Sequence, residues 1–95
     1  MRSRKDWTIV RRAVNDGFIL VTNNTVDFTP LYEREEIHAG LVCMNVAPGL
    51  MTLEVQRSLF LLALNQLAGN EPVNEALELT LTAEGEVILE RYALP

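Results

Sequence analysis

The sequence predicts an α/β fold: a small three-layer domain with parallel central strands and a C-terminal antiparallel hairpin. Two short apolar runs, at residues 18–21 and 41–46, have the composition of strands that are covered on both faces. A crossover separates them, and such a connection joins parallel strands. Residues 75–82 and 87–92 alternate between apolar and polar side chains, which is typical of paired strands in a hairpin.

The first helix is expected at residues 6–16, where apolar side chains recur at helical spacing. Gly17 follows at a position that tolerates a left-handed backbone, so the helix should end there. The run at residues 18–21 is too short for a helix and is rich in β-branched and aromatic residues, which favours a buried strand. Residues 22–25 are polar turn formers that end this strand.

The middle of the chain is expected to hold a short helical turn and the second strand. The turn should begin at Thr29 with Pro30 as its first helical residue, and it should carry residues 31–36. The second buried strand follows at residues 41–46 and is interrupted by the Pro48-Gly49 pair.

The longest helix is expected from Thr52, a suitable N-cap, to about Ala68. Its leucine-rich stripe should belong to the core or to a dimer interface. The hairpin comes next, with a turn at residues 83–86 between its two strands.

Composition limits the chemistry that is open to this chain. It has 95 residues and a formal charge of −5, which fits a single domain. The single cysteine, Cys43, excludes an internal disulfide and a cysteine-built zinc site, and we expect it to pack in the core. The single histidine, His38, excludes a multi-histidine metal centre within one chain, and we expect it to make structural hydrogen bonds. Carboxylate chemistry, hydroxyl chemistry and binding remain.

The hydropathy pattern predicts a cytoplasmic protein. No apolar run reaches the roughly 18 residues that a membrane-spanning helix needs, and no apolar signal-peptide core follows the first residues.

The charge is unevenly distributed along the chain. Residues 1–12 carry a net charge of +4 and residues 13–95 a net charge of −9. The basic end can contact phosphates or an acidic partner, although a solvated terminus is the simpler interpretation.

The first strand presents a difficulty, because no earlier strand in the chain can lie beside it. An apolar strand at an open sheet edge is an aggregation site. Either another subunit covers this edge or the chain is part of something larger. We therefore expect a homodimer or a higher oligomer.

Polar side chains gather where the first strand ends, and this end of a parallel sheet is where ligands bind. Thr22, Asn23, Asn24 and Asp27 lie there, and Asp6 opens the helix that runs antiparallel to the strand. Their carboxylate and amide oxygens suit Mg²⁺ or Mn²⁺, which can activate water and stabilise a phosphodiester during cleavage. The alternative interpretation is that the acid at position 6 caps its helix and the others are turn residues.

The same stretch resembles a known family. It combines an acid, a helix, a buried strand and an Asn–Asp turn at fixed spacing: Asp6, Ile9, Ala13, Gly17, Leu20-Val21-Thr22, Asn24 and Asp27-Phe28. This pattern resembles the C-terminal half of PIN domains, which are Mg²⁺- or Mn²⁺-dependent ribonucleases best known as VapC-type toxins of bacterial toxin–antitoxin pairs. The later residues His38-Ala39-Gly40-Leu41-Val42 resemble the strand that follows the motif in the PIN-like branch.

The resemblance implies roles for individual residues. Asp6 matches the third of the family's four acidic positions, and Asn24 with Asp27 matches the fourth region. Asp6 and Asp27 would then be catalytic, and Asp6, Asn24 and Asp27 would hold Mg²⁺ or Mn²⁺. Apart from the resemblance, Thr22 at the strand end, together with Asn23, is a candidate to position the substrate; Thr22 can equally cap the turn. RNA and an antitoxin protein are the partners that the resemblance implies.

Residues 1–95 are accordingly expected to form one PIN-like domain without the family's N-terminal strand and helix, which carry the first two acidic positions. A second hypothesis comes from a different class of function. In it, the chain is a non-catalytic PIN-like module for binding or dimerisation. The number of acids that meet at the end of the first strand separates the two hypotheses.

Overall fold

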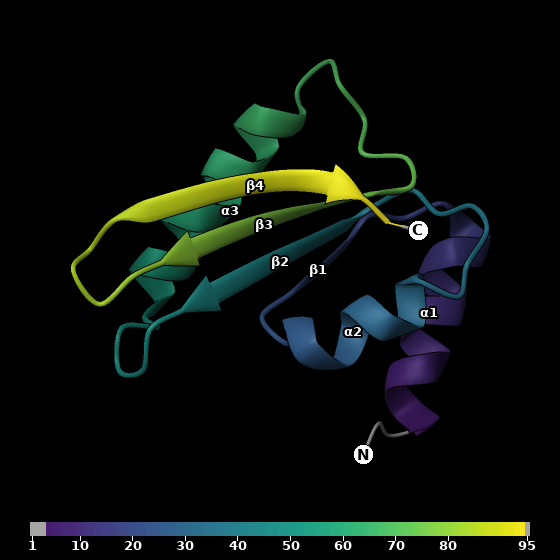
Figure 1. Cartoon of the computed structure of the whole chain (residues 1–95), viewed down its shortest axis with the longest axis horizontal. Helices are drawn as coiled ribbons and strands as arrows, with labels where there is room; N and C mark the ends of the chain where they lie inside the picture. Colours follow the sequence, from purple (N-terminus) through teal and green to yellow (C-terminus); the bar gives the residue numbers. More distant parts are fainter. Residues whose placement is uncertain (1–3, 95) are drawn as a thin grey trace.

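The computed structural model describes residues 4–94 and has the α/β architecture that the sequence predicts. Three helices surround one four-stranded sheet (Figure 1). Within the described residues, no helix combines the length and the apolar character that crossing a bilayer requires. The elements in chain order are α1 (Arg4–Asp16), β1 (Leu20–Thr22), α2 (Thr25–Tyr32), β2 (Leu41–Val46), α3 (Leu53–Leu67), β3 (Glu75–Leu81) and β4 (Val87–Ala93).

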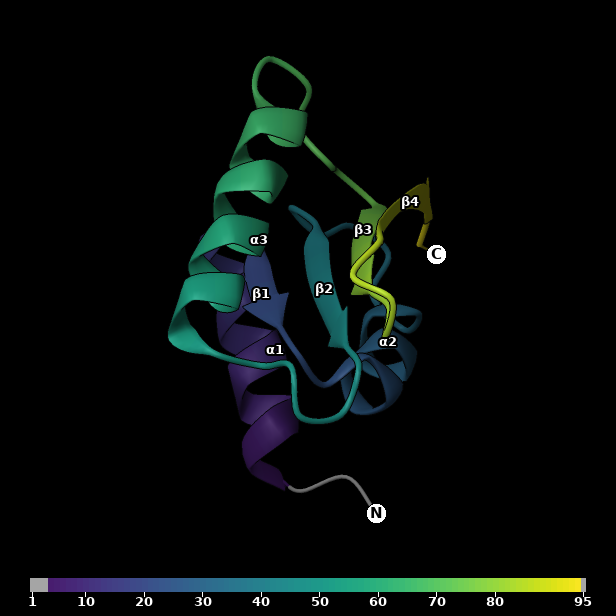
Figure 2. The same ribbon diagram turned by 90° about the vertical axis from the view of Figure 1, so that its left-hand side faces the viewer.

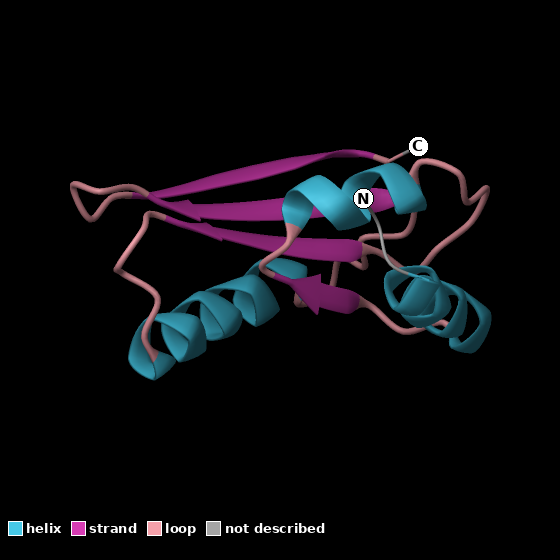
Figure 3. Cartoon of the chain, turned by 90° about the horizontal axis from the view of Figure 1, so that it is seen from below, coloured by secondary structure: helices cyan, strands magenta, loops and turns pink. Residues whose placement is uncertain are grey.

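The sheet has the spatial order β1-β2-β3-β4, with β1 and β4 at its two edges. β1 pairs with β2 and β2 pairs with β3 in parallel, whereas β3 and β4 form the antiparallel hairpin. This arrangement confirms the predicted parallel central strands and the predicted C-terminal hairpin. Helices α2 and α3 lie on opposite faces of the sheet (Figure 2 and Figure 3), and α1 packs against α2.

The core consists of two clusters, one on each face of the sheet, because successive side chains of a strand point to opposite faces. Towards α2, the cluster includes Leu41 and Cys43 of β2 together with buried residues of α1 and α2. Towards α3, Val42 and Met44 pack against Leu59 and other buried residues. Cys43 is fully buried, as predicted for a core residue.

Helix α3 begins as the sequence indicates. The Thr52 side chain caps it, because Oγ1 accepts a hydrogen bond from Val55 N at 3.1 Å. Its leucine-rich stripe is only partly core, however. Leu59 and Ala63 are buried, whereas Phe60 is 41% exposed.

The prediction for the second helix was wrong at both ends. Helix α2 begins at Thr25 rather than Thr29, and its first turn is closed by the hydrogen bond from Phe28 N to Asn24 O at 3.2 Å. Pro30 therefore lies inside the helix, where it has no N–H to donate. The helix ends two residues later at Tyr32, and residues 33–36 belong to a loop.

The first strand also differs from its prediction, since it covers Leu20–Thr22 instead of residues 18–21. The reason is the way in which α1 ends. Gly17 adopts a positive φ of 72°, and Phe18 N donates to Ala13 O at 2.9 Å, as in a Schellman motif. Phe18 thus belongs to the helix terminus. In this chain the strand is not covered on both faces, because Val21 is 38% exposed.

Candidate functional site

Three of the predicted site residues meet at the carboxyl end of β1. The backbone N–H of Asn24 donates to Thr22 Oγ1 at 3.0 Å, and Asn24 Nδ2 donates to Asp27 Oδ2 at 2.9 Å. Asn24 is the N-cap of α2, yet its side chain makes no capping hydrogen bond and reaches Asp27 instead. Asn23 is exposed beside this group. The structure thus brings Thr22, Asn24 and Asp27 into one hydrogen-bonded unit.

Asp27 lies in the first turn of α2, where the partial positive charge of the helix N-terminus stabilises a carboxylate. This position suits the turn role that the alternative interpretation gives to Asp27. It also places a carboxylate, half-buried and anchored through one oxygen, at the end of a parallel strand. Both interpretations of Asp27 therefore agree with the local geometry.

Asp6 lies in the first turn of α1, on a different helix from the other predicted ligands. Helix α1 packs against α2, so the two helices are neighbours. Within residues 4–94, no three or more carboxylate, imidazole or thiol side chains gather in a group that could hold a metal ion. The convergence of Asp6 with Asn24 and Asp27 stays a prediction.

The donor set nevertheless has the right chemistry for a hard cation. Mg²⁺ prefers oxygen ligands, keeps several waters, and is commonly held by one or two carboxylates together with substrate phosphates. Asp27 and Asp6 supply carboxylates, and Asn24 supplies an amide oxygen. These residue types are chemically suited to Mg²⁺ or Mn²⁺, and their meeting in one site stays a prediction.

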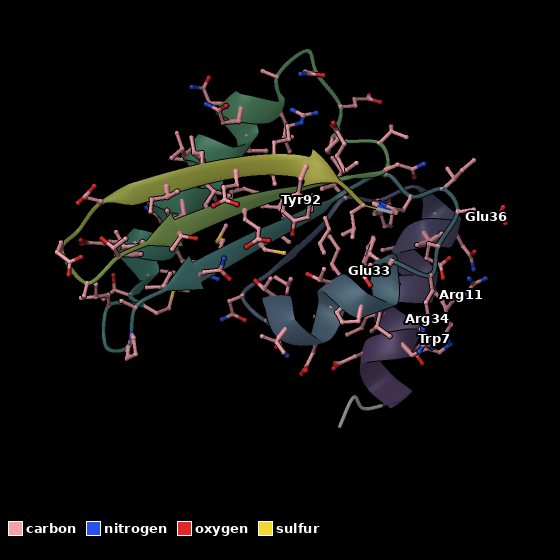
Figure 4. All side chains as sticks on the ribbon, viewed as in Figure 1. Trp7, Arg11, Glu33, Arg34, Glu36 and Tyr92 are labelled. Carbon is pink, nitrogen blue, oxygen red and sulfur yellow. The ribbon has the colours of Figure 1, made fainter. Side chains whose placement is uncertain are left out.

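A polar row on the sheet continues this site, and the sequence analysis missed it. Thr25 Oγ1 donates to Asn45 Oδ1 at 2.5 Å, and Asn45 Nδ2 donates to Glu78 Oε1 at 2.9 Å and to Thr80 Oγ1 at 3.3 Å. The Tyr92 hydroxyl donates to the second oxygen of Glu78. The row therefore runs from the start of α2 across β2 and β3 to β4. Tyr92, labelled in Figure 4, packs against the core cluster on the α2 face of the sheet.

The Tyr92 hydroxyl and the Cys43 thiol, which lie near Glu78, stay protonated in this environment. Burial, followed by the hydrogen bond to Glu78, raises the pKa of the Tyr92 hydroxyl. Burial also raises the pKa of the Cys43 thiol, which neighbours Glu78 in the β2–β3 register. Tyr92 therefore keeps its proton at neutral pH and acts as a hydrogen-bond donor.

The sequence contained a signal for this row. Asn45 interrupts the otherwise apolar strand at residues 41–46, and a polar group there must find a partner when half-buried. The alternation at residues 75–82 places Glu78 and Thr80 on one face, which the structure confirms. Only the sheet register shows that Asn45 and Tyr92 join that face.

His38 has the structural role that was expected. It is 2% exposed, its Nε2 donates to the carbonyl of Leu94, and its backbone N–H donates to Asn74 Oδ1 at 2.8 Å. The ring also makes an edge-on contact with Tyr32, with 4.7 Å between ring centroids. His38 thus ties the loop before β2 to the C-terminal end of the sheet.

Two apolar grooves flank β1, and neither of them is lined by the predicted site residues. The α1 groove has a volume of about 470 Å³ and is lined by Thr8, Ile9, Arg12, Ala13, Phe18, Ile19 and Leu20. The α3 groove has a volume of about 410 Å³ and is lined by Val21, Met44, Leu53, Gln56, Arg57 and Phe60.

Comparison of the chain with family models, with curated proteins and with solved structures finds no match. The PIN-like interpretation therefore rests on the sequence pattern alone, chiefly that between Asp6 and Phe28.

Proposed function

We propose that this chain is a cytoplasmic PIN-like protein of the toxin type, related to Mg²⁺- or Mn²⁺-dependent ribonucleases that cleave RNA phosphodiester bonds. The observation that supports this function best is the hydrogen-bonded unit of Thr22, Asn24 and Asp27. It lies at the carboxyl end of a parallel strand, where α/β sheets bind their ligands. These residues are also the ones through which the sequence resembles the family.

In this proposal, Asp27, Asn24 and Asp6 hold the cation, which supplies charge neutralisation at the scissile phosphate and a more acidic water. Asn24 Nδ2 holds Asp27 through Oδ2, so the carboxylate keeps one orientation. Thr22 Oγ1 accepts a hydrogen bond from Asn24 N. The Thr22 hydroxyl can therefore donate its own proton to a phosphate oxygen. Exposed Asn23 offers an amide N–H₂ group to the same phosphate. An antitoxin protein is the partner that this class of function requires.

The polar row behind the site positions it. The side chain of Thr25, the first residue of α2, is hydrogen-bonded to Asn45, and Asn45 is hydrogen-bonded to Glu78. Because α2 carries Asp27 two residues later, this row fixes the start of the helix against the sheet. Asn45 and Glu78 are positioning residues in this proposal.

Manganese binding and RNA cleavage test the proposal together. We expect isothermal titration of the whole chain to show Mn²⁺ binding at millimolar concentration or below. We also expect Mn²⁺-dependent cleavage of a structured RNA, which EDTA abolishes. A folded protein that binds no Mn²⁺ at millimolar concentration contradicts the enzymatic function.

A second function is favoured by a different observation. The strand β1 lies at an open edge between two apolar grooves, and Phe18 beside it is 60% exposed. These features suit a non-catalytic PIN-like module for binding or dimerisation. Absence of metal binding together with a stable oligomer would favour that module over the ribonuclease.

A further inference from the structure

Strand β1 leaves backbone hydrogen-bonding groups unused at its outer edge. Leu20 N donates to Gly40 O at 3.3 Å, so the Leu20 N–H faces β2. Backbone groups alternate in direction along a strand, and those of Val21 therefore point away from the sheet. The sheet order places no strand on that side among the described residues. The edge can accept one more strand.

The open edge of β1 lacks the sequence features that usually prevent an edge strand from pairing with another strand. No charged residue and no proline occurs from Gly17 to Val26. In natural proteins a lysine, a proline or a β-bulge usually keeps an edge strand from pairing with another chain. The opposite edge strand, β4, has charges in Glu90 and Arg91. Pairing through β1 brings no like charges together, whereas pairing through β4 would place its charged side chains, Glu90 and Arg91, at the new contact.

Both sides of the open edge are apolar. The α1 groove and the α3 groove lie beside β1, on α1 and on α3 respectively. A strand that enters this edge must therefore bury apolar side chains on both of its faces. The chain itself contains such a segment, since residues 18–21 form a continuous apolar run.

We propose that a second copy of this chain pairs its β1 antiparallel to this β1 and forms a two-fold symmetric dimer with one continuous sheet. In a two-fold contact each copy supplies the same surface, so both open edges are covered at once. The exposed Phe18 of each copy then packs into a groove of the other. The edge includes Thr22 of the candidate site. The dimer proposal uses only the free backbone groups and the apolar surroundings of β1, so it does not depend on metal binding or on ribonuclease activity.

The available area agrees with a dimer. The apolar side chains around β1 are 38–71% exposed. If each has a total area of ~150–200 Å², their exposed parts sum to roughly 500 Å² per copy. Polar rim residues such as Arg12 and Gln56 bring the patch near the ~800 Å² per partner of a standard interface. The side chains concerned are Ile9, Phe18, Ile19, Val21, Leu53 and Phe60.

Two matched isoleucines test the proposal. Ile19 beside β1 is 39% exposed, and Ile88 on β4 is 45% exposed. We expect sedimentation equilibrium of the whole chain to show a dimer at tens of micromolar concentration. Ile19→Lys should raise the dimer dissociation constant at least tenfold, and Ile88→Lys should leave it within about twofold. Circular dichroism checks that each variant is folded, and Phe18→Ser replaces Ile19→Lys if that variant unfolds.

The contrary outcomes are distinct. A wild-type monomer at tens of micromolar concentration overturns the proposal. A dimer that Ile88→Lys dissociates, whether or not Ile19→Lys does so as well, overturns the assignment of the interface to β1. Selective dissociation by Ile19→Lys or Phe18→Ser supports it.

Discussion

The side chains of Asn45 on β2 and Glu78 on β3 are joined by a hydrogen bond of 2.9 Å from Nδ2 to Oε1. Through Thr25 this pair reaches the start of α2, and through Tyr92 it reaches β4. A single contact between neighbouring strands therefore links the candidate site at the end of β1 to the far edge of the sheet.

Glu78→Ala should destabilise the fold. The substitution leaves the Tyr92 hydroxyl without its acceptor and removes the shorter of the two bonds from Asn45 Nδ2. An unsatisfied, partly buried polar group costs about 1–3 kcal/mol, so the free energy of unfolding should fall by that amount in urea denaturation. Exposed Glu90 lies opposite Glu78 in the sheet and is the matched control. Glu90→Ala should change stability by less than about 0.5 kcal/mol. Equal effects of the two substitutions would contradict a structural role for the polar row.

Acidification should destabilise the protein through His38. Burial lowers the pKa of His38 below its ordinary value of 6.5, although the Leu94 carbonyl and the charge of Glu35 act in the opposite direction. The unfolded chain therefore binds a proton more readily than the folded chain does. The free energy of unfolding should be constant above about pH 7 and should fall as the pH drops through 6.5.

Thermal unfolding between pH 7.5 and pH 5 measures this effect. His38→Gln keeps a polar side chain without an ionisable group, so its unfolding temperature should depend less on pH over the same range. A wild-type protein that becomes more stable on acidification in this range would contradict the assignment.

Gly40→Ala should be more disruptive than a substitution at an open turn. Gly40 has a φ of 132°, and an added Cβ would lie 2.5 Å from Pro72 Cγ and 2.7 Å from the Pro72 carbonyl oxygen. Gly69 also has a positive φ, of 74°, but an added Cβ would meet nothing within 4 Å. Gly69→Ala should cost about 1–2 kcal/mol from backbone strain alone, and Gly40→Ala should cost clearly more. Chemical denaturation of both variants compares them, and similar losses would show that contact with Pro72 is unimportant.

Much of the fold could be predicted because its signals are local. Thr52 caps α3 through its own side chain, and the alternation of β3 follows from the pleat of a strand. Helix α2 was misplaced because Pro30 suggested a helix start, whereas the chain uses Asn24 as the N-cap and places the proline near the other end. The local pattern was compatible with both positions, and packing of Phe28 and Leu31 into the core selects the earlier start.

The candidate site was predictable only in part, for a similar reason. Thr22, Asn24 and Asp27 lie within six residues of one another, so their proximity follows from a strand that turns into a helix. The bond between Asn45 and Glu78 joins residues 33 positions apart, and it depends on the parallel register of β2 and β3. The hydrophobic periodicity of a single segment carries no information about how two strands are aligned.

Asp27→Asn separates the two interpretations of the candidate site. If Asp27 holds a cation, removal of its charge should abolish Mn²⁺ binding and Mn²⁺-dependent RNA cleavage. The free energy of unfolding should change by less than about 0.5 kcal/mol, because asparagine keeps an oxygen that can accept the bond from Asn24 Nδ2. Asp16→Asn is the matched control, since that acid is exposed at the end of α1 and pairs with Arg12. It should leave both metal binding and cleavage unchanged.

The opposite pattern has an equally definite meaning. If Asp27 serves only the first turn of α2, Asp27→Asn should leave metal and RNA handling unchanged, and stability should change by no more than about 0.5 kcal/mol because asparagine serves the turn nearly as well. A stability loss above roughly 1.5 kcal/mol without any change in Mn²⁺ binding would refute the functional role of Asp27. In that case the carboxylate stabilises the start of α2, and the chain is better described as a binding or dimerisation module built around the open edge of β1.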